Sequence, residues 1–222
     1  MTRFLSTLLA FGLVSGAALA GSPHAPILSH NRRLTTTTAQ GVVGFPMKSP
    51  PPPAGTTQVA GNLNTFYRNG AYFPLEGYTI SGATSPVGQQ IFLAVPFTPT
   101  TTTTYAGARI GIGYVQGADG ANIALYSDNG GLPGSALDSG KAFNLQAFGG
   151  CCGIASVGAK NSVTLAAGTQ YWLVVSTATT GWEAWNLNTT DEVDTLNIAV
   201  NTGTGWAPSY AYPGPAYAVY GN

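Results

Sequence analysis

Apolar residues at every second position are the feature of this sequence that most constrains its fold. Ile91, Leu93, Val95 and Phe97 lie on one side of an extended chain, because successive side chains of a β-strand point to opposite faces. Comparable patterns occur in residues 105–115, 123–125, 143–147, 163–165, 182–188, 195–200 and 216–220. Residues 171–176 are apolar on both faces, which predicts a central strand.

Glycine-rich turns separate these segments at short intervals, and no stretch after the first twenty residues has helical periodicity. Asp128-Asn129-Gly130-Gly131 predicts a hairpin turn, in which Asn-Gly supplies positive φ angles. The many glycines form no dinucleotide-binding or P-loop pattern. We therefore predict an all-β fold, an antiparallel β-sandwich of the jelly-roll type.

The first twenty residues predict export. Arg3 precedes an apolar run over residues 4–14, and Ala18-Leu19-Ala20 matches the small-x-small pattern of a cleavage site. A membrane anchor is the alternative, but the apolar run is shorter than the roughly 20 residues of a spanning helix. We expect residues 1–20 to be a signal peptide and the mature chain to be secreted, without an integral membrane segment.

Residues 21–60 differ in composition from the rest of the chain. They contain Thr35–Thr38 and the run Pro50-Pro51-Pro52-Pro53, with few large apolar residues. A proline run forms a stiff polyproline spacer, and such a composition cannot bury a core. We predict a disordered linker over 21–60, although a stalk or a protein-binding motif also fits, and a single domain over 61–222.

Charge is scarce. Charged residues make up 7% of the chain, against about 25% in an average protein. Without Arg3, seven basic and eight acidic residues remain. The absence of a basic stripe argues against nucleic acid as a partner. With so few charges, neutral polar residues and glycine must cover the surface. Such a composition is typical of exported β-proteins that act by hydrogen bonding and stacking, and it fits a poorly soluble surface-layer component equally well.

The residues for catalysis are few. Both histidines, His24 and His30, lie in the predicted linker, which argues against a catalytic triad or a histidine-ligated metal in the domain. A glycosidase needs two carboxylates, and no spacing pairs any two of Glu76, Asp119, Asp128, Asp138, Glu183, Asp191, Glu192 and Asp194. We interpret these carboxylates as solvated or turn-forming. The acidic run at 191–194 has oxygen ligands for Ca²⁺ but lacks the glycine of an EF-hand loop. We expect no enzyme activity, no metal and no cofactor.

Cys151 and Cys152 are the only cysteines, and they are adjacent. In an oxidising compartment they can form a vicinal disulfide, pair between molecules or remain buried thiols. Neighbouring Cα atoms lie about 3.8 Å apart, closer than in an ordinary disulfide, but Gly149, Gly150 and Gly153 give the backbone freedom to distort. We predict the vicinal disulfide, acting as a stiffened turn or as an apolar platform for a ring.

Aromatic residues near the C-terminus are the candidate ligand-binding residues. Trp182 and Trp185 are three positions apart, so a strand sends them to opposite faces, and we expect one of them in the core. The other is expected, with Trp206, Tyr210 and Tyr212, to form an exposed stacking surface in loops. Such rings suit carbohydrate recognition, whereas packing within the sandwich is the alternative.

Several motifs occur in an order typical of one family. They are Phe97-Thr98-Pro99, residues 125–134, residues 165–172, Trp185-Asn186-Leu187-Asn188 and Ala218-Val219-Tyr220-Gly221. Over residues 78–222 the sequence resembles the exported bacterial β-sandwich domains called choice-of-anchor domains, most closely the R type. The resemblance implies an extracellular jelly-roll-like module with no established activity, and it implies no catalytic residues.

Together these features predict a secreted, non-enzymatic extracellular module that binds a glycan or a cell-surface protein through loop aromatics. A structural or self-associating cell-surface component is the second hypothesis, and a carboxylate-dependent glycosidase is the third.

Overall fold

The computed structural model describes residues 27–29, 51–63, 72–150, 152–188, 196–211 and 213–222. Within these residues all regular structure is β-strand, and no helix is long and apolar enough to cross a membrane. The strands are β1 (Ile27–Ser29), β2 (Thr57–Gly61), β3 (Phe73–Ser81), β4 (Phe92–Phe97), β5 (Thr103–Gln116), β6 (Ala121–Asp128), β7 (Pro133–Ala142), β8 (Ile154–Gly158), β9 (Thr164–Leu165), β10 (Tyr171–Thr177), β11 (Trp182–Leu187), β12 (Leu196–Asn201), β13 (Trp206–Ala211) and β14 (Tyr217–Gly221).

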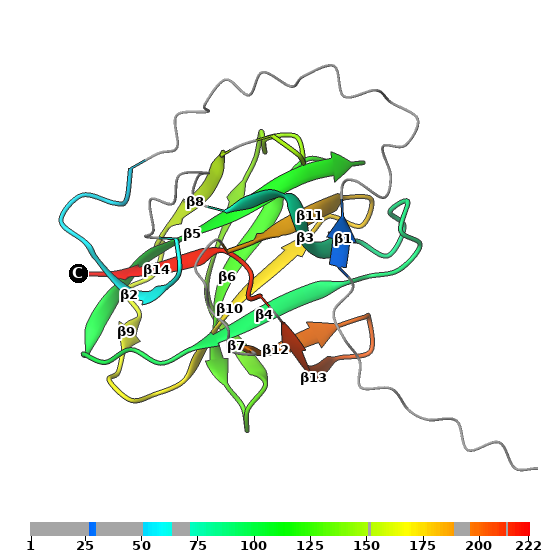
Figure 1. Cartoon of the computed structure of the whole chain (residues 1–222). Helices are drawn as coiled ribbons and strands as arrows, with labels where there is room; N and C mark the ends of the chain where they lie inside the picture. The colour runs from blue at the N-terminus through cyan, green and yellow to red at the C-terminus, as the bar shows by residue number, and fades with distance from the viewer. Residues whose placement is uncertain (1–26, 30–50, 64–71, 151, 189–195, 212) are drawn as a thin grey trace, which may run out of the picture.

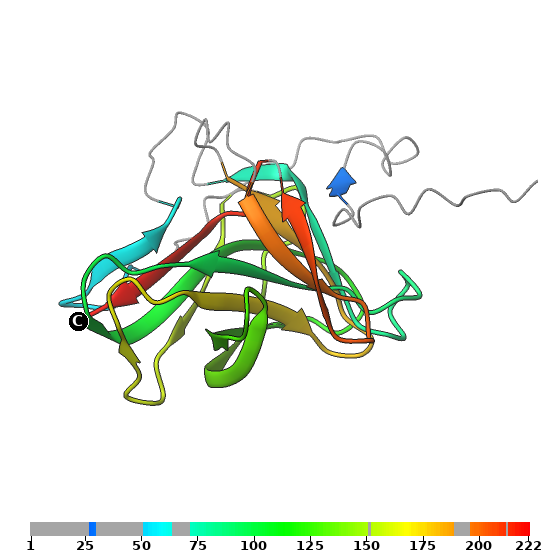
Figure 2. The ribbon, with the colours of Figure 1, turned by 90° about the horizontal axis from the view of Figure 1, so that it is seen from below.

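These strands form two antiparallel sheets that pack together, which confirms the predicted all-β sandwich (Figure 1). One sheet has eight strands in the order β1-β3-β11-β5-β14-β2, and β8 and β9 also pair with β5. The other has six strands in the order β13-β12-β4-β10-β6-β7. In Figure 2, β12 and β13 lie side by side at one edge of the six-stranded sheet.

β5 organises the eight-stranded sheet. Its fourteen residues pair with β11 through Ile112–Gln116, with β14 through Tyr105–Ile110 and with β8 through Gly107–Gly111. Most strands of globular proteins have about five or six residues, so a strand of this length reaches several partners. The predicted alternation holds here, because Ala108, Ile110 and Ile112 all face the core.

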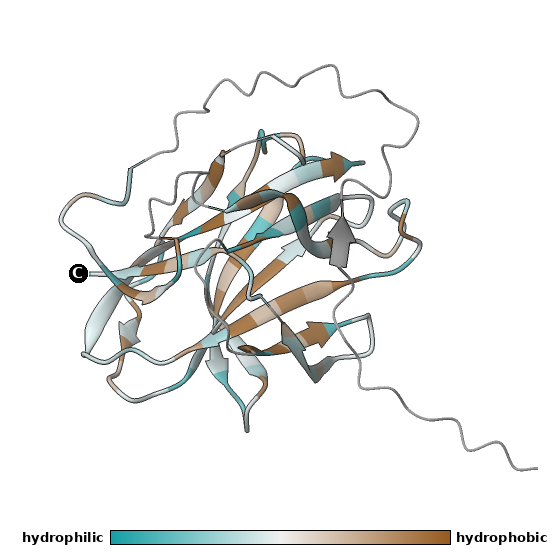
Figure 3. Cartoon of the chain, in the orientation of Figure 1, coloured by the Kyte–Doolittle hydropathy of each residue, from teal (hydrophilic) through white to brown (hydrophobic). Residues whose placement is uncertain are grey.

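The core lies between the two sheets. It combines the inward faces of both, with Ile80, Ile110 and Trp185 from the eight-stranded sheet and Leu93 and Leu173 from the six-stranded sheet. Apolar residues follow the strands, as on β4 and β12 (Figure 3). β10 lies between β4 and β6, so the strand predicted to be central from its two apolar faces is central.

The alternation rule failed around β7. A strand was predicted over residues 143–147, but the strand is β7, which precedes this segment and ends at Ala142. Phe143 is 62% exposed, and only Ala147 forms an isolated bridge, to Tyr114. β7 was missed because Gly134, Asp138 and Gly140 interrupt its apolar pattern.

The hairpin between β6 and β7 forms where the sequence predicts it. The backbone amide of Asn129 donates to the carbonyl of Leu132 at 2.8 Å. The two residues with positive φ are Gly130 and Gly131, at 64° and 85°, which are the central angles of a type I′ turn. Glycine at both central positions therefore supplies what was expected from Asn-Gly.

Two strands fall within the segment predicted as linker. β1 pairs with β3, and β2, which begins at Thr57, pairs with β14. Most of the remaining residues between 21 and 50, and the predicted signal peptide, lie outside the described residues. The disordered linker and the signal peptide therefore stay predictions.

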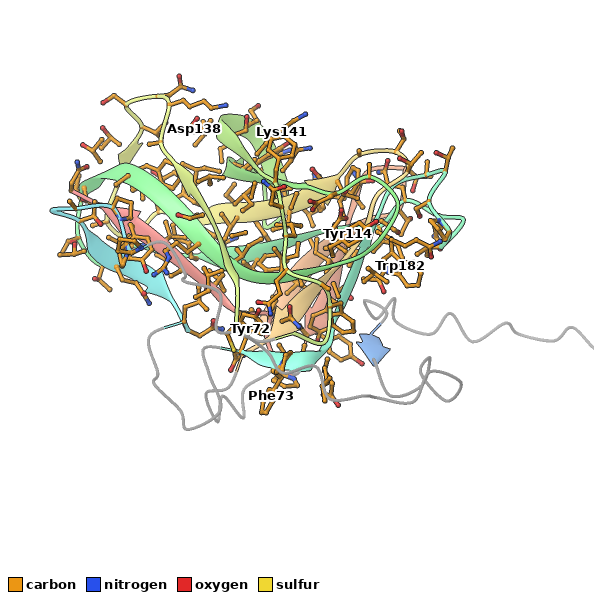
Figure 4. The ribbon with its side chains drawn as sticks, turned by 90° about the horizontal axis from the view of Figure 1, so that it is seen from above. Tyr72, Phe73, Tyr114, Asp138, Lys141 and Trp182 are labelled. Carbon is orange, nitrogen blue, oxygen red and sulfur yellow. The ribbon has the colours of Figure 1, made fainter. Side chains whose placement is uncertain are left out.

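A second apolar cluster covers the outer face of the eight-stranded sheet. It contains Leu63, Tyr72, Ala216, Ala218 and Tyr220. The Tyr72 hydroxyl donates to the carbonyl of Gly153 at 2.9 Å, and burial raises its pKa well above the usual value. Figure 4 shows Tyr72 and Phe73 on the side of the molecule opposite Asp138 and Lys141.

Gly111 on β5 provides a test of this packing. A Cβ at Gly111 would lie 2.5 Å from the Cδ1 atom of Tyr72, whereas a Cβ at Gly158 on β8 would meet nothing within 4 Å. We expect Gly111→Ala to lower the free energy of unfolding by about 1–3 kcal/mol through overpacking, and Gly158→Ala to change it little. Urea unfolding measures both, and an equal effect of the two variants would contradict the assignment.

Candidate functional site

The outer face of the six-stranded sheet carries a set of large aromatic side chains. We call it the outer aromatic face and define it by Phe92, Tyr126, Trp172, Trp206 and Tyr210. Trp172 is buried in a cluster against which Tyr126 and Trp206 pack. Phe92 and Tyr210 belong to the same face by register, because Asn201 pairs with Phe92 and with Trp206, and Asn197 pairs with Tyr210.

A row of small residues runs across the middle of this face. The register aligns Ala199 with Ala94, Ala94 with Val174, and Val174 with Ala124. All four are buried although they point away from the core. On one side of the row lie Trp206 and Phe92, and on the other lie Trp172 and Tyr126. The larger side chains on both sides therefore cover this row, and together they form a packed aromatic surface.

Hydrogen bonds through Asp128 hold the Trp172 side chain in place. Its Nε1–H donates to a carboxylate oxygen of Asp128 at 2.8 Å, and the Gln170 amide donates to the same oxygen at 2.8 Å. The other Asp128 oxygen accepts the backbone amide of Gly131 at 3.1 Å. The hydrogen bond from Trp172 is the largest cause that holds the pKa of Asp128 below its usual value. Asp128 therefore joins the β6–β7 turn to the aromatic face.

Four of the five aromatic rings remain partly open to solvent. Phe92, Tyr126 and Trp206 are half-buried, and Tyr210 is 36% exposed. Amide side chains lie among them, as Gln90 donates to the Oδ1 atom of Asn201 at 3.2 Å. From Tyr126 on β6 to Trp206 on β13 the face spans four strand spacings, about 19 Å.

The predicted aromatic site is only partly assembled. Trp182 and Trp185 are 3% and 0% exposed, so the expectation that one of them is exposed was wrong. Trp185 lies in the core and donates to the Ala216 carbonyl at 2.9 Å. Trp206 and Tyr210 lie on strand β13 and not in loops, which corrects their placement. Tyr212 lies outside the described residues.

β13 was missed as a strand because Gly203, Gly205 and Pro208 give its neighbourhood the composition of a loop. Proline is tolerated in a strand at the edge of a sheet, and β13 is an edge strand. Trp172, Tyr126 and Phe92 were not selected from the sequence either. The sequence could have identified them, because each is next to a core-facing residue in a predicted strand. Its side chain must therefore point to the outer face.

The predicted cysteine platform lies on the other sheet. Cys152 is half-buried and packs against the cluster that contains Tyr72 and Tyr220. Cys151 lies outside the described residues, so the vicinal disulfide stays a prediction. The flanking Gly153 amide donates to the Oε1 atom of Gln146, and Gly149 has a φ of 95°.

The carboxylates differ in their surroundings. Asp119 and Glu76 are exposed, as expected for solvated groups. Asp138 is 4% exposed and accepts the backbone amides of Ser139 and Lys160, each at 2.8 Å. Asp191, Glu192 and Asp194 lie outside the described residues, as do His24 and His30. Glu183 corrects the expectation, because it is completely buried.

Glu183 points between the sheets. It pairs with Ile80 and Tyr114, on the same face of β11 as Trp185. Burial is the largest cause that raises the pKa of its carboxyl to about 8, and Asp119 adds to the effect. The Thr177 hydroxyl and the Gly120 backbone act in the opposite direction. However, no hydrogen bond of normal geometry reaches either carboxylate oxygen.

Comparisons with protein-family models, with curated proteins and with solved structures find no match to this chain. The resemblance to choice-of-anchor domains therefore remains a prediction.

Glu183 makes stability depend on pH. The folded state holds its proton up to about pH 8, whereas the unfolded state releases it near 4.5. The free energy of unfolding should therefore fall as pH rises between these values and level off above them, by several kcal/mol at about 1.4 kcal/mol per unit. Urea unfolding in EDTA measures this. Glu183→Gln should remove most of the slope and Glu76→Gln should keep it; an unchanged slope in Glu183→Gln would refute the assignment.

The cysteine prediction is tested separately. We expect mass spectrometry of the native monomer to show two hydrogens missing at Cys151-Cys152, and a non-reducing gel to show no covalent dimer. Two thiols that react readily with an alkylating agent would contradict the disulfide.

Proposed function

We propose that this chain is a secreted, non-enzymatic module that binds a neutral glycan through the outer aromatic face. One observation carries the proposal. Half-buried aromatic rings stand on both sides of the row of small residues, on the outer face of the six-stranded sheet. Ligand sites are lined mostly by apolar and aromatic side chains with a few polar groups among them, and this face has that composition.

The chemistry of the face favours sugars over other ligands. Aromatic rings offer flat apolar surfaces on which the C–H faces of sugars stack. The amides of Gln90 and Asn201 beside Trp206 are suited to hydroxyl groups, because an amide both donates and accepts. With 7% charged residues, the chain has little means of attracting a charged ligand over distance.

The placement of the carboxylates supports a non-enzymatic role. A glycosidase positions its acid and its base or nucleophile against the sugar. Glu183 has the raised pKa of a catalytic acid, but both of its oxygens are buried between the sheets and out of reach of a bound glycan. Asp128 holds Trp172, and Asp138 accepts backbone amides. Asp128 and Asp138 therefore have structural roles, and the Glu183 carboxyl is inaccessible to a ligand on the outer aromatic face.

Truncation of the exposed rings tests the proposal. A glycan array first identifies a ligand, and calorimetry then measures its affinity. We expect Trp206→Ala and Tyr126→Ala each to weaken binding about tenfold to a hundredfold, because a lost ring contact costs about 1–3 kcal/mol. Phe73→Ala is the matched control, since Phe73 is 44% exposed but lies on the other sheet. It should leave the affinity unchanged.

Two further measurements, the salt dependence of binding and an analysis of the oligosaccharide for hydrolysis, can contradict the proposal. Binding should change little between low and high salt, because screening acts on charges. Loss of binding in salt would indicate a charged partner. Hydrolysis of the oligosaccharide, or equal weakening by Phe73→Ala and Trp206→Ala, would refute the proposed site.

A further inference from the structure

Two loops meet at the end of the sandwich near Glu183. One, residues 117–120, joins β5 to β6, and the other, residues 178–181, joins β10 to β11. They are in close contact, because a Cβ at Gly117 would lie only 1.9 Å from the carbonyl oxygen of Thr180. Figure 4 labels Tyr114 on β5, the strand that leads into the first loop, and Trp182, the residue that follows the second.

Oxygen atoms from several segments converge between these loops. Around the position that a Cβ on Gly181 would take, the Thr177 hydroxyl oxygen lies at 2.2 Å, the Ala118 carbonyl oxygen at 2.9 Å and an oxygen of Glu183 at 3.1 Å. The Thr177 hydroxyl donates a hydrogen bond to the carbonyl oxygen of Gly120 at 3.0 Å. Only glycine at 181 leaves room for this arrangement.

The buried carboxyl group of Glu183 lies beside these oxygens. Glu183 is 0% exposed, and no hydrogen bond of normal geometry reaches either carboxylate oxygen, although the Thr177 hydroxyl and the Gly120 backbone lie close to them. An ionised carboxylate buried without partners costs several kcal/mol, so native proteins neutralise such a group with a proton, pair it or use it to coordinate a metal ion. Asp119 lies near enough to act on Glu183 electrostatically. Once Glu183 loses its proton, near pH 8, two carboxylates so close are unfavourable unless a cation lies between them.

We propose that Glu183, Asp119, the Thr177 hydroxyl and the carbonyl oxygens of Ala118 and Gly120 form a Ca²⁺ site. All five donors are hard oxygen atoms, which Ca²⁺ prefers, and a bidentate carboxylate or water completes its six to eight ligands. No group of three or more His, Cys, Asp and Glu side chains gathers among the described residues. The site therefore depends on backbone and hydroxyl oxygens, a donor set that suits neither zinc nor copper.

The bound ion would join the two sheets. Glu183 belongs to β11 of the eight-stranded sheet, and Thr177 ends β10 of the six-stranded sheet. Ala118, Asp119 and Gly120 form the connection from β5 to β6, which also crosses between the sheets. We expect the ion to stabilise the sandwich from the end and to act independently of the outer aromatic face.

Thermal unfolding of the full mature chain provides the test. After treatment with EDTA, the protein is titrated with CaCl₂ near pH 8, up to about 10 mM, above the ~10⁻⁴–10⁻³ M dissociation constants of extracellular calcium modules. We expect Tm to rise by several degrees and calorimetry to show one ion per chain. MgCl₂ should give a smaller rise, because Mg²⁺ requires a near-octahedral site.

Variants distinguish this site from nonspecific binding. Glu183→Gln should abolish the rise in Tm, and Asp119→Asn should weaken Ca²⁺ binding about tenfold. Glu76→Gln, which removes an exposed carboxylate elsewhere, should change neither result. If Glu183→Gln does not fold, Thr177→Val decides instead, since it removes one donor and nearly preserves the shape.

Two results would overturn the proposal. One is an unchanged Tm of the native chain at about 10 mM Ca²⁺, above the usual affinities of such sites. The other is a Ca²⁺-dependent rise that survives in Glu183→Gln, or in Thr177→Val where the first variant is unfolded. Neither result bears on glycan binding, which is measured on variants of the other site.

Discussion

The pairing of β5 with strands from distant parts of the sequence is the constraint on which the rest of the structure depends. β11, β14 and β8 all pair with it, so the second half of the chain must close back onto residues 105–116. Its inward face supplies Ile110 and Ile112 to the core. Its outward face carries Gly111, and only a residue without a side chain leaves room for the Tyr72 ring against the β5 backbone at this position. One strand thus determines packing on both sides of its sheet.

The two faces of the six-stranded sheet follow from a single alternating pattern. Leu173 and Val175 enter the core, while Trp172 and Val174 between them point outward. An outward tryptophan that is nonetheless buried needs neighbours to cover it and an acceptor for its N–H. Tyr126 supplies part of the cover, and Asp128 accepts the hydrogen bond. The proposed binding face is therefore held in place by the same strands that build the core.

The sequence was sufficient to predict the fold class, the central position of β10 and the turn at Gly130, because each depends on local alternation or on a local backbone angle. Pairing partners and burial were not predictable in this way. The burial of Glu183 results from β5, β3 and the two end loops closing around it, and these are far apart in the sequence. β13 shows a different limit, since Pro208 argues against a strand unless the strand is known to lie at an edge.

Asp138 on β7 and Pro208 on β13 protect the two edges of the six-stranded sheet against pairing with other copies of the molecule. An exposed strand edge invites another chain to pair with it. β7 forms one edge of the six-stranded sheet, and there Asp138 accepts the Lys160 amide while the Asn161 side chain donates to the carbonyl of Leu137. β13 forms the other edge, and Pro208 removes one backbone donor from it. Both edges of the six-stranded sheet are thus protected against edge-to-edge pairing with another molecule. The proposed binding face would therefore stay on separate molecules and not become part of a fibre.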